Sequence, residues 1–413
     1  MRIVHLIHNY HPSVGGSQLV FQRLSEGFVA LFDDEVTVLT TNALQSPHEL
    51  KSARIPAGDE MLNGVKVRRF GYSRGVLPAL RLADRGLRRL GLPGAEYVRV
   101  LRHGPISLSM FHAFRRLPAD VIGATSSSYL HMLYPAVARR LGPTPPLVYF
   151  GALHASDGKV ERPVLRGIGD AAVYVAYTAY EHDILVRHGV PAEKIHVQGL
   201  AVDVEQLSAA DGSGARTRLG LRSDPVVAFI GRQAAHKGVD TLIVAMRSVW
   251  QHVPNARLLI AGARTVYSVE VDALLKKLGP AERARVHVVD DFSEAQKPEL
   301  FAACDVLVSV SREESFGLVY LEAWAAGKPV VGSRIPAVES VVRDGCDGLL
   351  VPYRDAEALS SAIASLLLDQ SLRARLGAHG QARVRREHTW ERVIRYVHAL
   401  YEQVAEQART EPR

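Results

Sequence analysis

Short apolar runs alternate with longer stretches of helical periodicity along this chain of 413 residues. Runs typical of buried strands occupy residues 3–7, 36–39, 121–122, 147–150, 173–176 and 195–197, and again residues 226–230, 256–261, 286–289, 306–310, 329–332 and 348–351. Between strands, residues 19–31 and 239–252 place apolar side chains at helical spacing. Strands that alternate with helices predict parallel sheets with crossover helices.

A polar stretch over residues 208–216 interrupts this alternation near the midpoint and predicts part of a linker. We therefore expect an α/β protein of two doubly wound Rossmann-like domains, residues 1–203 and 204–388, facing across a deep cleft. The tail from residue 356 to about 408 has a helical pattern rich in Arg and Glu. Ligands of such sheets bind outside the carboxyl ends of the strands, so the residues that follow each strand are the candidates for chemistry.

The composition is that of an ordinary globular protein, with 47% hydrophobic and 23% charged residues, which excludes a disordered or fibrous chain. Cys304 and Cys346 are 42 positions apart, a spacing that fits no metal site and makes a disulfide doubtful. The N-terminal residues lack a signal-peptide pattern, and no run of 18 apolar residues occurs. These features predict a cytoplasmic protein, soluble or peripheral on the inner face of the plasma membrane.

The first candidate for chemistry is the loop at residues 231–238, Gly-Arg-Gln-Ala-Ala-His-Lys-Gly, directly after a predicted strand. Glycines let a backbone approach an anion closely, and the helix that follows offers its N-terminal amides. Arg232 and Lys237 add two cations, so the loop suits a diphosphate. The alternative interpretation is a plain strand-to-helix turn with solvated charges. The spacing is not that of a Walker loop.

The second candidate spans residues 311–322, where a strand ends and a helix is predicted to begin near Phe316 and Gly317. Glu314 precedes this helix and Glu322 lies within it. Carboxylates accept hydrogen bonds from pairs of hydroxyl groups, as in sugars and ribose. The free amides of Phe316, Gly317 and Leu318 would lie at the positive end of the helix. A capping Glu and an ordinary surface Glu are the alternative.

In this order, the motifs resemble those of the retaining glycosyltransferases of family 4, which have the GT-B fold. The resemblance extends over nearly the whole chain and is carried by residues 12–18 with the Gly15-Gly16 pair, 189–195, 202–203, 231–238, 314–322 with its Glu-x7-Glu spacing, and 336–345. It implies that residues 1–203 form the acceptor side and residues 204–388 the nucleotide-sugar domain. It also implies that a helix in residues 389–413 crosses back to the N-terminal domain.

The resemblance assigns a role to each matching residue. Arg232 and Lys237 would hold the diphosphate of the donor and neutralise the charge that develops as it leaves. Glu322 would bind the ribose hydroxyls, and Glu314 the donor sugar. The amides of residues 316–318 would also bind that sugar. From the N-terminal domain, Gly16 would let its loop approach the diphosphate, and His154 would lie near the sugar.

The reaction that the resemblance implies is a front-face substitution with retention, without an obligatory metal or cofactor. The donor would be a nucleotide-diphosphate sugar, first of all a UDP- or GDP-sugar, and the acceptor a hydroxyl group of a glycan, a lipid-linked sugar or a small molecule. Ala201, Val310 and the Asp290-Asp291 pair depart from the usual family pattern. Since the last of these usually meets the base, the sequence does not assign the nucleotide.

The basic excess of the chain is concentrated between residues 66 and 116, which hold twelve Lys and Arg against Asp84 and Glu96. Between residues 77 and 101 the arginines alternate with leucines, a pattern typical of segments that lie on anionic bilayers. This segment predicts docking on a membrane or contact with a phosphate-bearing acceptor, and a solvated Arg-rich face is the alternative. Nucleic acid is a poorer interpretation, because Phe and Tyr are not interleaved in a stacking pattern.

Three other functions stay open at this point. One is a synthase or phosphorylase of the same fold that acts on a free sugar or a sugar phosphate. Another is a nucleotide-sugar epimerase, against which the Glu314 and Glu322 motif argues. The third is a non-catalytic nucleotide-sugar-binding scaffold at a membrane, which donor hydrolysis or transfer would distinguish from the enzymes.

Overall fold

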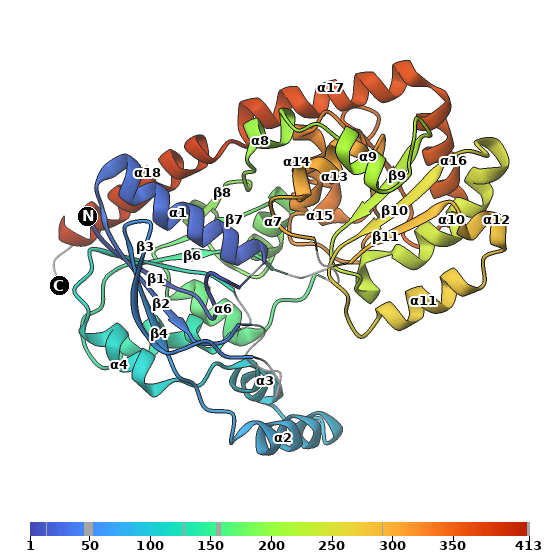
Figure 1. Ribbon diagram of the computed structural model, residues 1–413. Coiled ribbons are helices and arrows are strands. Elements are labelled where there is room, and N and C mark those ends of the chain that lie inside the picture. Colours follow the sequence, from blue (N-terminus) through green and yellow to red (C-terminus); the bar gives the residue numbers. More distant parts are fainter. Residues whose placement is uncertain (14, 45–52, 127–128, 154–157, 291, 411–413) are drawn as a thin grey trace. The chain divides into compact units, whose positions relative to one another are not determined.

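The structure is a computed structural model that describes residues 1–413 except 14, 45–52, 127–128, 154–157, 291 and 411–413 (Figure 1). Its chain divides into two compact units. Unit 1 comprises residues 1–199 together with 391–413, and unit 2 comprises residues 200–390. Each unit has its own α/β sheet and its own hydrophobic core.

Unit 1 is built on an eight-stranded sheet of order β3-β4-β2-β1-β5-β6-β7-β8, in which only β3 runs antiparallel to its neighbour. The strands are β1 (Arg2–Leu6), β2 (Glu35–Thr41), β3 (Gly58–Leu62), β4 (Val65–Phe70), β5 (Val121–Ala124), β6 (Leu147–Phe150), β7 (Val173–Ala176) and β8 (Ile195–Val197). The helices are α1 (Gly16–Phe32), α2 (Leu77–Arg89), α3 (Ala95–His103), α4 (Leu108–Arg116), α5 (Tyr134–Arg139), α6 (Arg162–Gly169), α7 (Ala179–Arg187) and α18 (Trp390–Thr410), with short 3₁₀ turns at Leu130–Leu133 and Ala192–Lys194.

Helix α18 completes the core of unit 1 although it follows unit 2 in the chain. Ile394 packs so closely on Gly27 of α1 that a methyl group there would lie 2.4 Å from its Cδ1 atom. The Tyr401 hydroxyl lies 3.1 Å from Nε2 of the fully buried His5 in β1. The first half of the chain therefore needs residues near the other end of the sequence to close its core.

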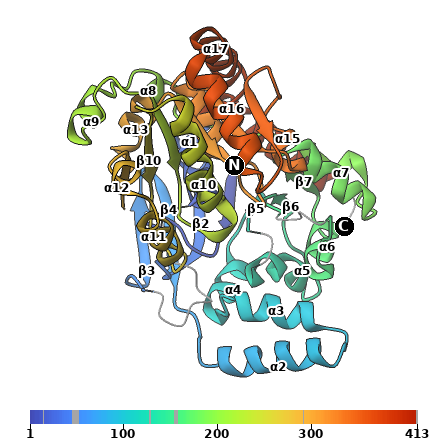
Figure 2. The same ribbon diagram turned by 90° about the vertical axis from the view of Figure 1, so that its right-hand side faces the viewer.

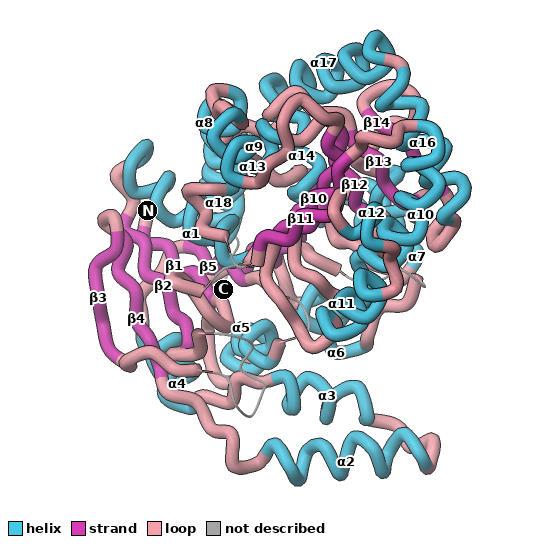
Figure 3. The backbone as a smooth tube through the Cα atoms, turned by 45° about the vertical axis from the view of Figure 1, so that its right-hand side comes forward, coloured by secondary structure: helices cyan, strands magenta, loops and turns pink. Residues whose placement is uncertain are grey.

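Helices α2 and α3 lie side by side in unit 1 (Figures 2 and 3). Asp84 of α2 is buried and pairs with two arginines, Arg88 of its own helix at 2.8 Å and Arg102 of α3 at 2.9 Å. This buried carboxylate joins the two helices and neutralises these two arginines. Leu82 of α2 and Leu90, which directly follows that helix, are each 71% exposed.

Unit 2 is built on a six-stranded parallel sheet of order β11-β10-β9-β12-β13-β14. The strands are β9 (Val226–Ile230), β10 (Arg257–Ala261), β11 (Val286–Val289), β12 (Val306–Ser309), β13 (Val330–Ser333) and β14 (Gly348–Val351). The helices are α8 (Val204–Ser208), α9 (Ser213–Arg218), α10 (Val239–His252), α11 (Ser268–Lys276), α12 (Pro280–Arg283), α13 (Lys297–Ala303), α14 (Leu318–Ala325), α15 (Pro336–Glu339), α16 (Ala356–Leu368) and α17 (Gln370–Glu387), with a 3₁₀ turn η3 (Ala235–Lys237).

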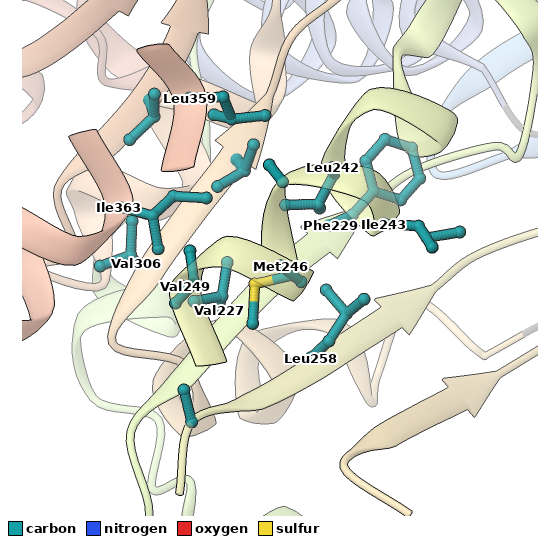
Figure 4. Close-up of a cluster of buried hydrophobic side chains, with 14 of the residues drawn as sticks. Val227, Phe229, Leu242, Ile243, Met246, Val249, Leu258, Val306, Leu359 and Ile363 are labelled. Atoms are coloured by element: carbon teal, nitrogen blue, oxygen red, sulfur yellow. The ribbon is translucent and has the colours of Figure 1, made fainter. Parts of the chain in front are cut away.

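The core of unit 2 forms where α10 and α16 pack on one face of this sheet. Figure 4 shows its centre, where Met246 of α10 lies beside Val227 and Leu242 beside Phe229 of β9, and Ile363 of α16 lies beside Val306 of β12. Strands buried on both faces are apolar along their whole length. That is why continuous apolar runs predicted them.

One sequence prediction needs correction, and one pair of strands has no counterpart in the sequence predictions. The polar stretch over residues 208–216 is not a linker: it spans the end of α8 and most of α9, within unit 2, and Ala215 is fully buried. The hairpin of β3 and β4 was not predicted, because β3 is an exposed edge strand of mostly polar sequence.

Both cysteines are free, and burial raises the pKa of Cys304 to about 12.

Candidate functional site

The candidate site in unit 2 is formed by the loops that follow β9 and β12, which are neighbouring parallel strands. Both loops leave the carboxyl edge of the sheet, the edge at which ligands of doubly wound sheets bind. The backbone N–H of Arg312 donates to the carbonyl oxygen of His236 at 2.7 Å, so the two loops are joined directly. Residues 231–238 and 311–322, which the sequence singled out separately, thus belong to one structural feature.

Gly238 sets the distance between these loops. Its φ of +71° is in the left-handed region, which residues with a Cβ atom adopt only at a cost. A Cβ atom at this position would lie 2.3 Å from the carbonyl oxygen of Val310, the residue that directly follows β12. The start of α10 therefore packs directly on the backbone that leads to Glu314.

Lys237 and Glu314 form the central ion pair of the site. Lys237 Nζ lies 2.5 Å from Glu314 Oε1, and the hydroxyl of the fully buried Ser311 donates to the same oxygen at 2.9 Å. The Glu314 side chain is only 7% exposed and that of Lys237 22%. Because the pair is shielded from water, its charges act on a ligand more strongly than surface charges do.

The beginning of α14 provides a set of backbone donors beside this pair. Gly317 caps the helix with φ +89°, and a Cβ atom there would lie 2.6 Å from the ring of Tyr320. The Tyr320 hydroxyl donates to the carbonyl oxygen of Ser309 at 2.6 Å, which fixes the helix to β12. The first amides of a helix have no partner within the helix and carry a partial positive charge, so the N-terminus of α14 favours an electronegative group.

Glu322 lies one turn further along α14 and pairs with a residue that the sequence did not single out. Lys297 Nζ, at the start of α13, lies 2.5 Å from Glu322 Oε1 and 3.4 Å from an oxygen of Glu294. Burial opposes the charge of Lys297, but the carboxylates of Glu322 and Glu294 outweigh it and raise the pKa of the lysine. Glu322 and Lys297 are thus a second, largely buried ion pair at this edge of the sheet.

Gln233 extends the polar network toward β10 and β11. Its side chain is fully buried and donates to Asp290 Oδ1 at 3.1 Å, while its Oε1 atom has no hydrogen-bond partner among the described residues. Arg264 lies 3.5 Å from the other oxygen of Asp290. Asp291, the second residue of the pair noted in the sequence, lies outside the described residues.

The remaining predicted residues are distributed as follows. Arg232 is exposed, and its guanidinium has no ion-pair partner within the part of the chain that the structure describes. Phe316 is buried against His388, with ring centroids 6.0 Å apart. Gly16 begins α1 in unit 1 and is exposed. His154 lies outside the described residues, so its role stays a prediction, as does that of Gly16.

The sequence missed Lys297 and Gln233 for different reasons. Lys297 is 25 positions from its partner Glu322, and a spacing of this length does not predict contact in a doubly wound fold. The Pro298 that follows Lys297 indicates only the start of a helix. In the sequence, Gln233 stands out only as a member of the glycine loop at residues 231–238. The signal that could have marked it is a polar residue three positions after a buried strand.

Residues 216–383 match the family model of glycosyl transferases group 1. They make up most of unit 2 and contain both loops of the candidate site. Among the curated relatives, the chain is 34% identical over 249 residues to a D-inositol 3-phosphate glycosyltransferase of Xylanimonas cellulosilytica, a match that covers 56% of this chain and 58% of that protein. The same enzyme name belongs to a relative from Geodermatophilus obscurus, 34% identical over 254 residues, with 58% of this chain and 54% of that protein covered. The chain thus spans between half and three fifths of the length of these two relatives.

Solved structures resemble the chain over nearly its full length. Anabaena HepE in complex with UDP and glucose matches with a TM-score of 0.72 and 20% identity, covering 98% of this chain and all of that one. The sucrose-phosphate synthase of Thermosynechococcus elongatus matches with a TM-score of 0.74 and 20% identity, covering 98% of each chain. At this identity the likeness shows the fold. The predicted GT-B architecture of two Rossmann-like sheets is confirmed, and the matches together support a transferase enzyme.

Two further findings concern the described residues only. None of their helices has the length and apolar character needed to cross a membrane. No three of their His, Cys, Asp or Glu side chains gather into a set that could hold a metal ion. The absence of an obligatory metal from the reaction stays a prediction.

Proposed function

We propose that the protein is a retaining glycosyltransferase that moves a hexose-type sugar from a nucleotide-diphosphate sugar to a hydroxyl acceptor. The observation that carries the proposal is the buried Lys237–Glu314 pair, held at the carboxyl ends of β9 and β12 beside the free amides of α14. A cation, a carboxylate and backbone donors within one shielded site match a sugar joined to a diphosphate. HepE, which has been crystallised with UDP-glucose, supports a UDP-sugar as the first donor to test, with a GDP-sugar next.

Each residue has a defined task in this proposal. Arg232 and Lys237 neutralise the diphosphate. Glu314 accepts hydrogen bonds from the hydroxyls of the sugar, and the amides of residues 316–318 donate hydrogen bonds to its oxygens. Glu322 accepts hydrogen bonds from the ribose hydroxyls. Unit 2 is the nucleotide-sugar domain and unit 1 the acceptor side. Several such contacts, placed in advance, hold the donor in one orientation and lower the barrier to its departure.

The proposed reaction is a front-face substitution without a metal. The bond between the anomeric carbon and the diphosphate oxygen breaks, and its electron pair leaves with the phosphate. The acceptor oxygen forms the new bond on the same face of the sugar, and its proton passes to the departing phosphate oxygen. No protein side chain is needed as a base, because the leaving group takes the proton.

A donor screen tests this function. UDP-, GDP-, ADP- and dTDP-sugars are compared by thermal shift and by hydrolysis, with Glu322→Ala, Lys237→Met and the exposed Lys276→Met as variants. A bound donor raises the melting temperature by mass action. We expect one donor to stabilise the wild type and Lys276→Met but neither site variant. If no donor stabilises the wild type and none is turned over, the transferase proposal is wrong. That result would favour a non-catalytic scaffold at a membrane.

The acceptor and the stereochemistry need separate assays. Inositol phosphates, free sugars and sugar phosphates are offered with the donor found above, because the relatives include D-inositol 3-phosphate glycosyltransferases and a fold neighbour is sucrose-phosphate synthase. Transfer to a sugar phosphate would favour the synthase alternative. Nuclear magnetic resonance of the product reads the anomeric configuration, and inversion would contradict the front-face step.

We also propose that α2 and α3 dock on an anionic bilayer. Leu82 of α2 and Leu90 just beyond its end are highly exposed, and the exposed Arg85 and Arg89 lie on the same helix. Exposed leucines beside arginines match a surface of anionic lipid headgroups over acyl chains. Flotation with neutral and anionic vesicles tests this, with Arg85→Glu/Arg89→Glu as the variant. Equal recovery with both vesicle types would exclude membrane docking.

A further inference from the structure

We infer that Lys297 is a positioning residue that holds Glu322 for the vicinal hydroxyls of a ribose, so that the site discriminates between ribonucleotides and 2′-deoxyribonucleotides. The inference rests on the proposed function and deepens it, since it concerns the nucleotide half of the donor. It adds a residue to which no sequence motif pointed.

The geometry gives Lys297 one dominant partner. Its ammonium group lies 2.5 Å from Glu322 Oε1, a short charge-assisted hydrogen bond, against 3.4 Å to the exposed Glu294. The Glu322 side chain is 10% exposed and that of Lys297 21%, so the pair is largely removed from water. Lys297 belongs to α13 and Glu322 to α14, and their contact therefore fixes the carboxylate relative to a second element.

The chemistry of the pair suits a diol. A carboxylate only accepts hydrogen bonds, and one lysine contact on Oε1 leaves Oε2 and the remaining lone pairs for two hydroxyl donors. The lysine also stabilises the charge of Glu322 in a shielded position, where a lone carboxylate would be costly. A ribose offers two neighbouring hydroxyls to this acceptor, whereas a 2′-deoxyribose offers one.

Removing Lys297 should therefore reduce the preference for ribonucleotides over 2′-deoxyribonucleotides, and not only the affinity for nucleotides. Hydrogen bonds to charged groups contribute roughly 10- to 100-fold in affinity. Without Lys297 the Glu322 carboxylate is free to turn, and the contact with the second hydroxyl is the one that is lost. A ribonucleotide loses this contact, while a 2′-deoxynucleotide never made it.

The experiment is calorimetric titration of the full chain with UDP and 2′-deoxy-UDP, and with GDP and 2′-deoxy-GDP. The variants are Lys297→Met, which keeps the length of the side chain, and Lys297→Arg, which keeps its charge. The matched controls are Glu294→Gln and Lys276→Met. Thermal melting without nucleotide establishes that each variant is folded.

We expect the wild type to prefer the ribonucleotide by roughly tenfold or more, and Lys297→Met to reduce this ratio to within about threefold. Lys297→Arg should retain most of the wild-type ratio of ribonucleotide to 2′-deoxyribonucleotide affinity. The controls Glu294→Gln and Lys276→Met should have the wild-type ratio. If Lys297→Met binds with the wild-type ratio, or binds both nucleotides more tightly, the inference is overturned while the proposed function stands. If the wild type binds none of the four nucleotides, the proposed function itself fails.

Discussion

Replacing Gly238 by alanine tests the packing that joins the two loops of the site. A comparison with Gly345→Ala isolates the effect, because both glycines have φ +71° in unit 2. A Cβ atom on Gly238 would lie 2.3 Å from the carbonyl oxygen of Val310, whereas one on Gly345 would meet nothing within 4 Å. The two variants thus share the cost of the left-handed backbone and differ in the clash.

The magnitudes follow from these two contributions. An alanine in the left-handed region costs about 1–2 kcal/mol, which is the whole effect expected for Gly345→Ala. Forcing the Gly238 backbone away from Val310 adds about 1–3 kcal/mol, as overpacking of a core does, so Gly238→Ala should lose about 2–5 kcal/mol of unfolding free energy. The same displacement moves Lys237 relative to Glu314, and donor affinity should fall with stability.

Urea denaturation gives the stabilities, and titration with the donor found in the screen gives the affinities. Unfolding is monitored for unit 2, since a chain of two units need not unfold in one step. The reasoning is refuted if Gly238→Ala is no less stable than Gly345→Ala. It is also refuted if Gly238→Ala is destabilised as expected yet binds donor with the wild-type affinity, because the spacing of the loops would then not matter for binding.

Three further predictions concern single groups. Glu181 is fully buried and accepts backbone and side-chain donors on both carboxylate oxygens, so Glu181→Gln should leave a buried N–H without an acceptor and lower the unfolding free energy by about 1–3 kcal/mol in urea titrations. Hydrogen bonds from Arg2 lower the pKa of Asp120 from its ordinary value of 3.8 to about 2, so this pair stabilises the fold above pH 3.8 and loses its effect as the pH falls to 2. The wild type should therefore melt at a higher temperature than Asp120→Asn above pH 3.8, and this difference should disappear as the pH falls to 2. Mass spectrometry after alkylation of the native protein at pH 8 should find Cys346 modified and Cys304 unmodified, because burial raises the pKa of Cys304 to about 12.

Much of the fold could be predicted because the buried strands are short and continuously apolar. Strands such as β9, Val226–Ile230, and β6, Leu147–Phe150, were predicted to the residue. Strand β3 escaped because Gly58–Leu62 lies exposed at the edge of the sheet, where no core selects apolar side chains. A polar composition at residues 208–216 suggested a linker, but turns between short helices have the same composition.

The candidate site was predictable to the extent that it depends on strand ends. Lys237 and Glu314 each follow a predicted strand, and their contact at 2.5 Å follows from the pairing of β9 with β12. Lys297 could not be found in this way, because it contacts Glu322 from a crossover helix. Which residues of two neighbouring helices contact each other depends on side-chain packing, which the order of apolar runs does not reveal.

The return of the chain through α18 has a consequence for the order of events during synthesis on the ribosome. Unit 2 is an insertion whose two ends are held side by side, since the Val202 N–H donates to the carbonyl oxygen of His388 at 3.1 Å and His388 Nδ1 lies 2.8 Å from the carbonyl oxygen of Leu200. All of its residues leave the ribosome before Tyr401, on which the core of unit 1 depends. Unit 2 can therefore fold first, although most of unit 1 precedes it in the sequence, and unit 1 must wait with an incomplete core.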